Sequence, residues 1–136
     1  MTGQLHALVA DDEPHIGRII KMKLEQGLFR VTLAYDGQEA LDVLRQSGDV
    51  ALVVLDLMMP RLSGLEVLAS MRDDARLKSI PCMVLTAAGE EQYHRRAMDM
   101  GANCFLTKPF SPKKLYAVAA ELAGGGAADT ASAILQ

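Results

Sequence analysis

The sequence contains no tryptophan, and aromatic residues of all kinds make up only 4% of its 136 residues. Charge of one sign is not concentrated anywhere: 14 basic and 17 acidic side chains are spread along the chain and give a net charge of −3. The longest uninterrupted apolar run is far shorter than the ~20 residues that a transmembrane helix needs. These absences argue against a nucleic-acid-binding face, against a membrane span and, weakly, against a stacked flavin cofactor.

Cysteine is scarce as well. Cys82 and Cys104 lie within apolar segments, as buried free thiols do. We expect two reduced thiols in a cytoplasmic protein, and we favour this over a disulfide or a metal pair because no third or fourth soft ligand accompanies them. The N-terminus, MTGQLHALVA, lacks a cationic region followed by a long apolar stretch, so we expect no signal peptide.

What the sequence does contain is an alternation of short apolar runs with amphipathic segments, over the length of one domain. The apolar runs predict β-strands at Leu5–Ala10, Arg30–Ala34, Val50–Asp56, Pro81–Thr86 and Cys104–Thr107. Between them, apolar residues recur on one helical face in the sets Ile16, Ile19, Ile20 and Leu24; Leu65, Leu68 and Met71; and Leu115, Val118 and Leu122. Five strand–helix units in succession predict an α/β fold with a parallel sheet covered by helices on both faces.

Several helix boundaries are marked by capping residues. Asp36 with Glu39, and Ser63 with Glu66, have the spacing of capping boxes. Ser111 stands directly before a proline, which predicts an N-cap followed by proline at the first helical position. The helix that begins near residue 90 carries the segment EEQYHRRAMDM, which we interpret as a solvated face.

The composition changes after residue 123, where the chain continues as GGGAADTASAILQ. Such a stretch of small residues is typical of a flexible segment. We therefore expect one domain over residues 1–123 and a flexible tail or truncated linker over residues 124–136.

Polar side chains follow four of the five expected strands, at the point where each strand ends. The first strand ends in Asp11 and Asp12, the third in Asp56, the fourth in Thr86 and the fifth in Lys108. In an open parallel sheet these ends share one edge, and ligands bind beyond it where the winding reverses. An ionised acid beside a buried strand costs several kcal/mol unless it has a partner, so the sequence predicts a partner for Asp56.

The acids indicate a metal site if the first and third strands are neighbours. Two carboxylates ~4 Å apart repel each other by ~1 to 4 kcal/mol, and a bound divalent cation removes this conflict. Oxygen ligands with room for water suit Mg²⁺, although the residues alone leave Mn²⁺ and Ca²⁺ open. The plainer alternative is that one of Asp11 and Asp12 caps the first helix while the other is solvated.

The remaining two side chains would complete a phosphoryl pocket. Alone, Lys108 reads as an ordinary loop lysine and Thr86 as an ordinary strand residue. Together with a metal they offer an ammonium and a hydroxyl to an incoming phosphoryl group. Asp56 would then be the nucleophile, since carboxylates form aspartyl-phosphate intermediates.

From about Leu5 to Leu122, the chain resembles the receiver domain of two-component response regulators. The matching residues are Asp11 and Asp12, Asp56, Pro60 and Gly64, Thr86 and Ala87, and Lys108, Pro109 and Phe110. The resemblance implies a flavodoxin-like, doubly wound, five-stranded parallel sheet in the order 2-1-3-4-5 with five helices, as in chemotaxis receivers.

The resemblance also implies a role for each acid of the site. Asp56 is implied as the phosphoacceptor and as a metal ligand. Asp12 is implied as a direct Mg²⁺ ligand and Asp11 as a ligand acting largely through water. The backbone carbonyl of Met58 is implied as the third protein ligand of the metal.

Other positions match residues that recognise the phosphoryl group or respond to it. Thr86 and Lys108 are implied to contact the phosphoryl oxygens, and Thr86 and Phe105 to act as a switch pair. The Lys108–Pro109 bond is implied to be a cis peptide. Met58 and Ala88 occupy positions that vary in the family and modulate the rate of dephosphorylation.

By this resemblance, the protein is a cytoplasmic signalling receiver that takes its phosphoryl group from a sensor histidine kinase or a phosphotransfer protein. Phosphorylation is expected to change the surface near the fourth helix, fifth strand and fifth helix. We expect no enzymatic turnover beyond its own phosphorylation and slow dephosphorylation, no nucleic-acid contact within this chain and no membrane contact.

The alternative functions are a phosphorylation-independent interaction module, an FMN binder and an aspartyl-phosphate hydrolase. The hydrolase would need a second acid where this chain has Met58.

Overall fold

Five strands and five helices alternate along residues 4–124, the part of the chain that the computed structural model describes. They are β1 (Leu5–Ala10), α1 (Pro14–Glu25), β2 (Phe29–Ala34), α2 (Gly37–Gln46), β3 (Val50–Asp56), α3 (Gly64–Arg72), β4 (Cys82–Ala87), α4 (Glu91–Asp99), β5 (Cys104–Lys108) and α5 (Pro112–Ala123). The five strands and the alternation are therefore as the sequence predicts, with strand boundaries that differ by one residue at β2, β4 and β5.

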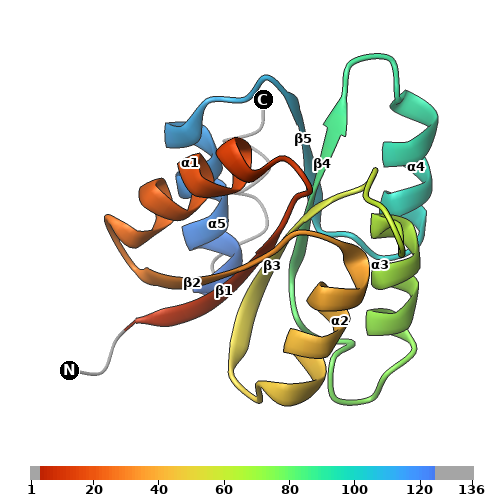
Figure 1. Ribbon diagram of the computed structural model, residues 1–136, viewed down its shortest axis with the longest axis horizontal. Helices are drawn as coiled ribbons and strands as arrows, with labels where there is room; N and C mark the ends of the chain where they lie inside the picture. The colour runs from red at the N-terminus through yellow and green to blue at the C-terminus, as the bar shows by residue number, and fades with distance from the viewer. Residues whose placement is uncertain (1–3, 125–136) are drawn as a thin grey trace.

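The strands form one parallel sheet in the order β2-β1-β3-β4-β5, which confirms the predicted topology (Figure 1). From β1 the chain winds outward to β2, then returns and winds through β3, β4 and β5 in the opposite direction. The reversal lies between β1 and β3, so the carboxyl ends of these two strands flank the crevice in which open α/β sheets bind ligands.

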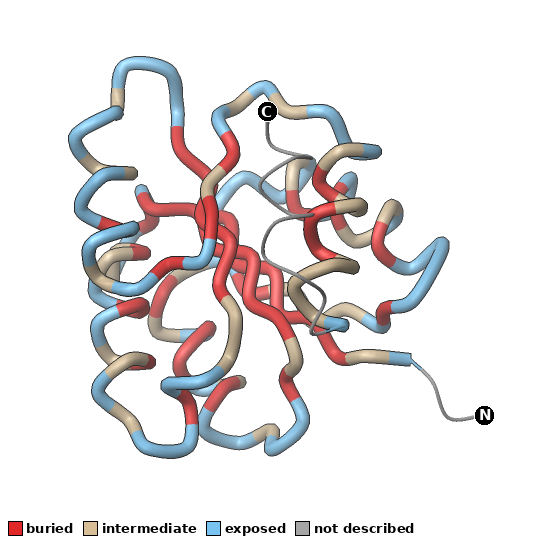
Figure 2. The backbone as a smooth tube through the Cα atoms, turned by 180° about the vertical axis from the view of Figure 1, so that it is seen from behind, coloured by how far each residue is buried: buried red, intermediate tan, exposed pale blue. Residues whose placement is uncertain are grey.

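Helices cover both faces of the sheet. Figure 1 shows α1 and α5 on one face and α2, α3 and α4 on the other. Each layer has its own apolar core, one built around Ile20, Leu24 and Val118 and the other around Leu44, Leu68 and Met71. In Figure 2 the buried residues are concentrated in the strands that run through the middle of the molecule.

Strand β3 illustrates why its sequence is a continuous apolar run and not an alternating one. Val53 and Leu55 pack into the core beneath α2 and α3, whereas Leu52 and Val54 pack into the core beneath α1 and α5. All four are fully buried. A strand with helices on both faces has no solvent side, so the apolar run ends only where β3 ends, at Asp56.

The helix starts follow the capping signals with one difference. Ser63 and Glu66 form the full capping box at α3, and the Ser111 hydroxyl accepts a hydrogen bond at α5. At α2 the Asp36 carboxylate accepts from the Glu39 amide, but the Glu39 carboxylate accepts from the amide of Tyr35 instead of that of Asp36. The predicted box at Asp36 is therefore only half formed.

The apolar face predicted for α1 includes one residue that the structure leaves exposed. In α1, Ile20 and Leu24 are buried against the sheet, but Ile19 is 45% exposed. Ile19 and Ile20 are 100° apart on the helix, and the contact with the sheet is centred on Ile20. The sequence pattern gives the spacing of apolar residues but not the orientation of the helix on the sheet.

The two cysteines are free and lie on opposite faces of the sheet. Cys82 belongs to the core beneath α2, α3 and α4, and Cys104 to the core beneath α1 and α5. Burial raises the pKa of each thiol to about 12. The disulfide alternative is excluded by this geometry, because side chains on opposite faces cannot reach each other.

Within residues 4–124, no helix combines the length and the apolar character that crossing a lipid bilayer requires. The tail predicted for residues 124–136 lies, apart from Gly124, outside the described residues.

Candidate functional site

Three carboxylates meet where the sheet changes its winding direction. Asp11 directly follows β1, and Asp56 is the last residue of β3; because Ala10 pairs with Leu55, the two acids leave the sheet side by side. One carboxylate oxygen from each of Asp11, Asp12 and Asp56 lies within 4.8 Å of the others. Asp11 and Asp56 are buried and Asp12 is exposed. The structure therefore brings together all three acids that the sequence singled out.

Lys108 is the partner of Asp56. It ends β5, two strands away, and its side chain reaches across the edge of the sheet. Lys108 Nζ lies 3.4 Å from Asp56 Oδ2, 3.1 Å from Asp11 Oδ2 and 2.9 Å from Glu13 Oε1. Burial alone would lower the pKa of Lys108, but the hydrogen bond to Glu13 and the charges of Asp56 and Asp11 outweigh it and raise this pKa above its usual range. The ammonium therefore stays charged.

One lysine does not fully compensate the acids around it. Burial, together with the charge of Asp11, raises the pKa of Asp56 to about 7, although Lys108 and the Met58 amide both act in the opposite direction. The Met58 N–H donates to Asp56 Oδ1 at 3.3 Å. Asp11 Oδ2 makes an ion pair with Lys108 but receives no hydrogen bond from the described residues.

The donor set fits a hard divalent cation. It consists of carboxylate oxygens alone, on converging strand ends, and Asp12 lies open to solvent, where a metal could keep water ligands. Burial and the neighbouring charge of Asp11 both disfavour ionised Asp56, and a bound cation would offset both effects. Asp11, Asp12 and Asp56 are therefore the residues that could hold Mg²⁺.

The raised pKa of Asp56 makes stability depend on pH. Between 3.8 and about 7 the folded protein holds a proton that the unfolded chain has released, so the contribution of Asp56 to stability falls as the pH rises through this window. Without divalent cation, we expect Asp56→Asn to be more stable than the wild type by about 2 to 4 kcal/mol at pH 8, and by much less at pH 5. Urea unfolding at both pH values measures this difference; an equal advantage at pH 5 and pH 8 would contradict the assignment.

Thr86, the last residue but one of β4, carries a hydroxyl with no hydrogen-bond partner among residues 4–124. The residue is 1% exposed, and Thr86 Oγ1 makes no hydrogen bond within the described residues. Leaving a buried hydroxyl unpaired costs about 1 to 3 kcal/mol. By strand alternation Thr86 faces the same side as Val84, and Phe105 on the neighbouring strand packs into that same core. Thr86 and Phe105 thus share one face of the sheet.

A hollow of about 260 Å³ opens at this edge and is lined by Asp12, Glu13, Asp56, Met58, Ala87, Glu90 and Lys108. Met58 is 50% exposed, and Ala88 lies exposed in the loop after β4. The Lys108–Pro109 peptide bond is cis. Apart from Thr86 and Phe105, which face the core, the predicted site residues thus lie in or next to this hollow.

Three residues that contact the site residues were not predicted from the sequence. Glu13 binds Lys108, and the Glu90 carboxylate accepts a hydrogen bond from the Ala87 amide at 2.9 Å. His94 is half-buried and stacks on Phe105, with ring centroids 4.1 Å apart and planes at 15°. The prediction of a solvated face on α4 holds for Arg95 and Arg96 but is wrong for His94. An acid next to Asp12 was a readable signal for Glu13. The Glu90 contact depends on the turn between β4 and α4, and the His94 contact depends on how α4 lies against β5.

The sequence profile of the family described as "Response regulator receiver domain" matches residues 7–120. The chain belongs to this family. Two solved structures support the assignment. The receiver domain of the Francisella response regulator 1452 is 31% identical, with a TM-score of 0.81 over 90% of this chain and 98% of that one. The chemotaxis response regulator CheY4 of Vibrio cholerae is 26% identical, with a TM-score of 0.75 over 81% of this chain and 91% of that one.

Among curated relatives, the transcriptional regulatory protein SrrA of Staphylococcus aureus is 38% identical over 108 residues. The match covers 79% of this chain but only 43% of SrrA, so the receiver domain spans less than half the length of this relative. Membership implies phosphorylation-controlled signalling, because receiver domains are phosphorylated by histidine kinases or phosphotransfer proteins and bind Mg²⁺ at an acidic pocket. Asp11, Asp12 and Asp56 form an acidic cluster that could hold such an ion.

Proposed function

We propose that this receiver domain accepts a phosphoryl group on Asp56 from the phosphohistidine of a sensor histidine kinase or a phosphotransfer protein. The observation that carries the proposal is the setting of Asp56: a buried carboxylate at the topological switch point, beside two further acids and within 3.4 Å of the Lys108 ammonium. Glu13, which is half-exposed, holds the ammonium from the solvent side.

In the proposed transfer, a carboxylate oxygen of Asp56 attacks phosphorus. The new O–P bond forms as the P–N bond to the donor imidazole breaks, and the imidazole leaves with the bonding electrons and takes up a proton. With acetyl phosphate as donor, the P–O bond breaks and acetate leaves. Lys108, 3.4 Å from Asp56, stabilises the charge on the phosphoryl oxygens. Bound Mg²⁺ would neutralise further charge on these oxygens.

The metal ligands are part of the same proposal. Asp12, exposed at the mouth of the hollow, would bind Mg²⁺ directly, and Asp11 would bind it largely through water. Asp56 would be the second direct carboxylate ligand, and the backbone carbonyl of Met58 would be the third protein ligand. The hydrogen bond from Met58 N–H to Asp56 supports this, because it keeps the backbone at Met58 beside the acids. Mn²⁺ would fit the same oxygen donors.

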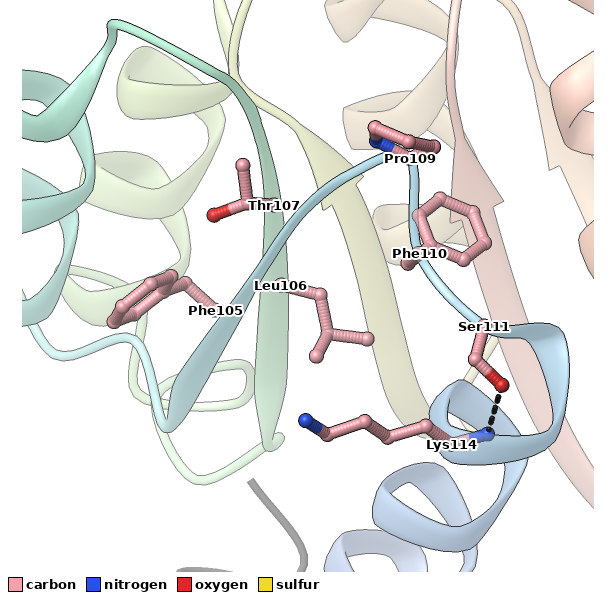
Figure 3. A pocket seen from close by; sticks show the side chains of 7 residues that line it. All are labelled: Phe105, Leu106, Thr107, Pro109, Phe110, Ser111 and Lys114. Carbon is pink, nitrogen blue, oxygen red and sulfur yellow. Dashed lines mark hydrogen bonds between the residues drawn. The ribbon is translucent and has the colours of Figure 1, made fainter. Parts of the chain in front are cut away.

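We further propose that the phosphoryl group draws the Thr86 hydroxyl towards itself and that Phe105 moves into the space this leaves. Thr86 Oγ1 supports this, because it is buried and has no hydrogen-bond partner in the described part of the chain, and a phosphoryl oxygen would give it one. Phe105 also lines a hollow of about 470 Å³ along β5 and the start of α5 (Figure 3). A repacking of Phe105 would therefore alter the surface formed by α4, β5 and α5, which a downstream effector can recognise.

The surroundings of Asp56 predict a long-lived aspartyl phosphate. Met58 and Ala88 carry no group that can orient an attacking water or donate a strong hydrogen bond. We expect the wild type to lose its phosphoryl group about tenfold more slowly than a Met58→Asn/Ala88→Glu double variant. Decay of the phosphorylated protein, followed by intact mass after removal of the donor, measures both rates; equal rates would contradict this role of the two positions.

We place this receiver in the cytoplasm, which two free buried thiols support. We propose that residues 1–123 form the receiver domain and residues 124–136 its tail or linker. SrrA is named as a transcriptional regulator, so control of transcription through an effector outside this chain is the output we propose. The receiver itself catalyses only its own phosphorylation and slow dephosphorylation. Met58, where a hydrolase would carry a second acid, supports this restriction.

Phosphorylation by a small donor tests the proposal without knowledge of the kinase. Incubated with acetyl phosphate and Mg²⁺, the protein is expected to gain the mass of one phosphoryl group, and a chelator is expected to prevent the gain. No gain in the presence of Mg²⁺, or an equal gain in the presence of the chelator, would contradict the proposed function.

A further inference from the structure

The turn between β4 and α4 is closed by two hydrogen bonds between the same two residues. The Glu90 amide donates to the Ala87 carbonyl at 3.1 Å, and the Ala87 amide donates to Glu90 Oε1 at 2.9 Å. Gly89 has a φ of +90°, which suits the third residue of a tight turn. The half-buried Glu90 side chain is thereby folded back onto the end of β4.

The Ala87 amide points towards the site of the acids. The Leu57 amide donates to the Leu85 carbonyl, so Leu85 directs its backbone polar groups towards β3. Alternate residues of a strand direct these groups to the same side, and Ala87 is therefore also turned towards β3. Since β3 ends at Asp56, the Ala87 N–H faces the space beyond that carboxylate, and both Ala87 and Glu90 line the hollow there.

We propose that the Glu90 carboxylate takes the place of a phosphoryl oxygen. It accepts the hydrogen bond of the Ala87 N–H in the unphosphorylated protein and must release it when Asp56 is phosphorylated. This inference rests on the proposed function. A carboxylate oxygen and a phosphoryl oxygen are both anionic acceptors for the same N–H, and only one of them can occupy it. The hollow already holds three further acids and a single lysine, so the two anions would repel each other.

The position of Glu90 couples this exchange to α4. Glu90 is the residue directly before α4, and His94, one helical turn further on, stacks on Phe105. When Glu90 leaves, the β4–α4 turn loses one of its two closing hydrogen bonds. Glu90 therefore links occupancy of the phosphoryl site to the helix that rests on Phe105, and it opposes phosphorylation until the incoming group displaces it.

The test uses beryllofluoride, a small phosphoryl mimic that binds carboxylates, titrated with Mg²⁺ into the whole chain and followed by amide NMR. We expect Glu90→Ala, which lacks both acceptor and charge, to bind beryllofluoride about five- to tenfold more tightly than the wild type. Glu90→Gln, which keeps an acceptor without the charge, is expected to show about a two- to fivefold gain. Glu91→Gln is the matched control: it removes an adjacent, exposed charge and is expected to bind as the wild type does.

The Ala87 amide signal reports the exchange directly. Before ligand is added, its proton is expected to shift upfield in Glu90→Ala, because it has lost its acceptor; with beryllofluoride bound, wild type and variant are expected to converge. Equal or weaker binding by Glu90→Ala, or an unchanged Ala87 signal in its unligated form, would overturn the inference while leaving the proposed function intact. Failure of the wild type to bind beryllofluoride, or binding by Asp56→Asn equal to the wild type, would overturn both.

Discussion

Replacing Lys108 with alanine is expected to slow phosphoryl transfer from acetyl phosphate by about 100- to 1,000-fold, the usual cost of removing a charge-stabilising group from an active site. Two effects combine. The phosphoryl oxygens lose their ammonium partner, and Asp56 loses the cation that now opposes the rise of its pKa. The carboxyl group of Asp56 is then more often protonated at neutral pH and is a weaker nucleophile.

The second effect distinguishes a role of Lys108 in phosphoryl transfer from a purely structural one. The loss of rate should be larger at pH 6.5 than at pH 8.5, because the higher pKa of Asp56 matters most at the lower pH. Lys113→Ala is the control, since Lys113 is an exposed lysine near the start of α5. Initial rates by intact mass at both pH values measure the effect. A Lys108→Ala variant that is phosphorylated at the rate of the Lys113→Ala variant would contradict the role given to Lys108.

Replacing Gly64 with alanine is expected to destabilise the protein by about 2 to 4 kcal/mol. An added Cβ at Gly64 would lie 2.3 Å from the carbonyl oxygen of Asp56 and 2.6 Å from the Cα of Leu57. Gly64 also donates its amide to the Leu57 carbonyl at 2.9 Å, which ties the start of α3 to the end of β3. Both contacts are with backbone, so neither can be relieved by a rotamer change.

The matched control for this variant is Gly48→Ala, because an added Cβ at Gly48 meets no atom within 4 Å. Its stability is expected to stay within about 0.5 kcal/mol of the wild type. Urea unfolding of both variants measures the difference. Because accommodating the methyl group must move the backbone at Asp56, Gly64→Ala should also be phosphorylated more slowly than Gly48→Ala. Equal stabilities would show that the packing of α3 against the end of β3 is not as tight as described.

The sheet and the acid cluster could be predicted because both follow from order along the chain. Parallel strands place their carboxyl ends at one edge, so Asp11, Asp56 and Lys108 had to lie along that edge once the strands were identified, and strand order decided which of them meet. Strand order itself was supplied by the family resemblance, since the apolar runs look alike whether a strand is central or at an edge.

Side-chain contacts of the loops and helix starts could not be predicted in this way. Glu90 reads as one acid in a charged segment, and its bond to Ala87 depends on the tight turn at Gly89. His94 reads as part of a polar helix face, and its stack on Phe105 depends on the rotation of α4 about its axis. Ile19 is the opposite case: its apolar side chain and helical spacing predict burial, but it is 45% exposed.

Locating the phosphoryl group on the chain is the decisive experiment. After reaction with acetyl phosphate and Mg²⁺, reduction with borohydride converts an aspartyl phosphate to homoserine, which peptide sequencing by mass spectrometry can place. We expect one modified residue, Asp56, and no modification in Asp56→Asn, while Asp99→Asn, which alters an exposed acid of α4, should react as the wild type does. Modification at any other residue, or undiminished modification of Asp56→Asn, would contradict this expectation.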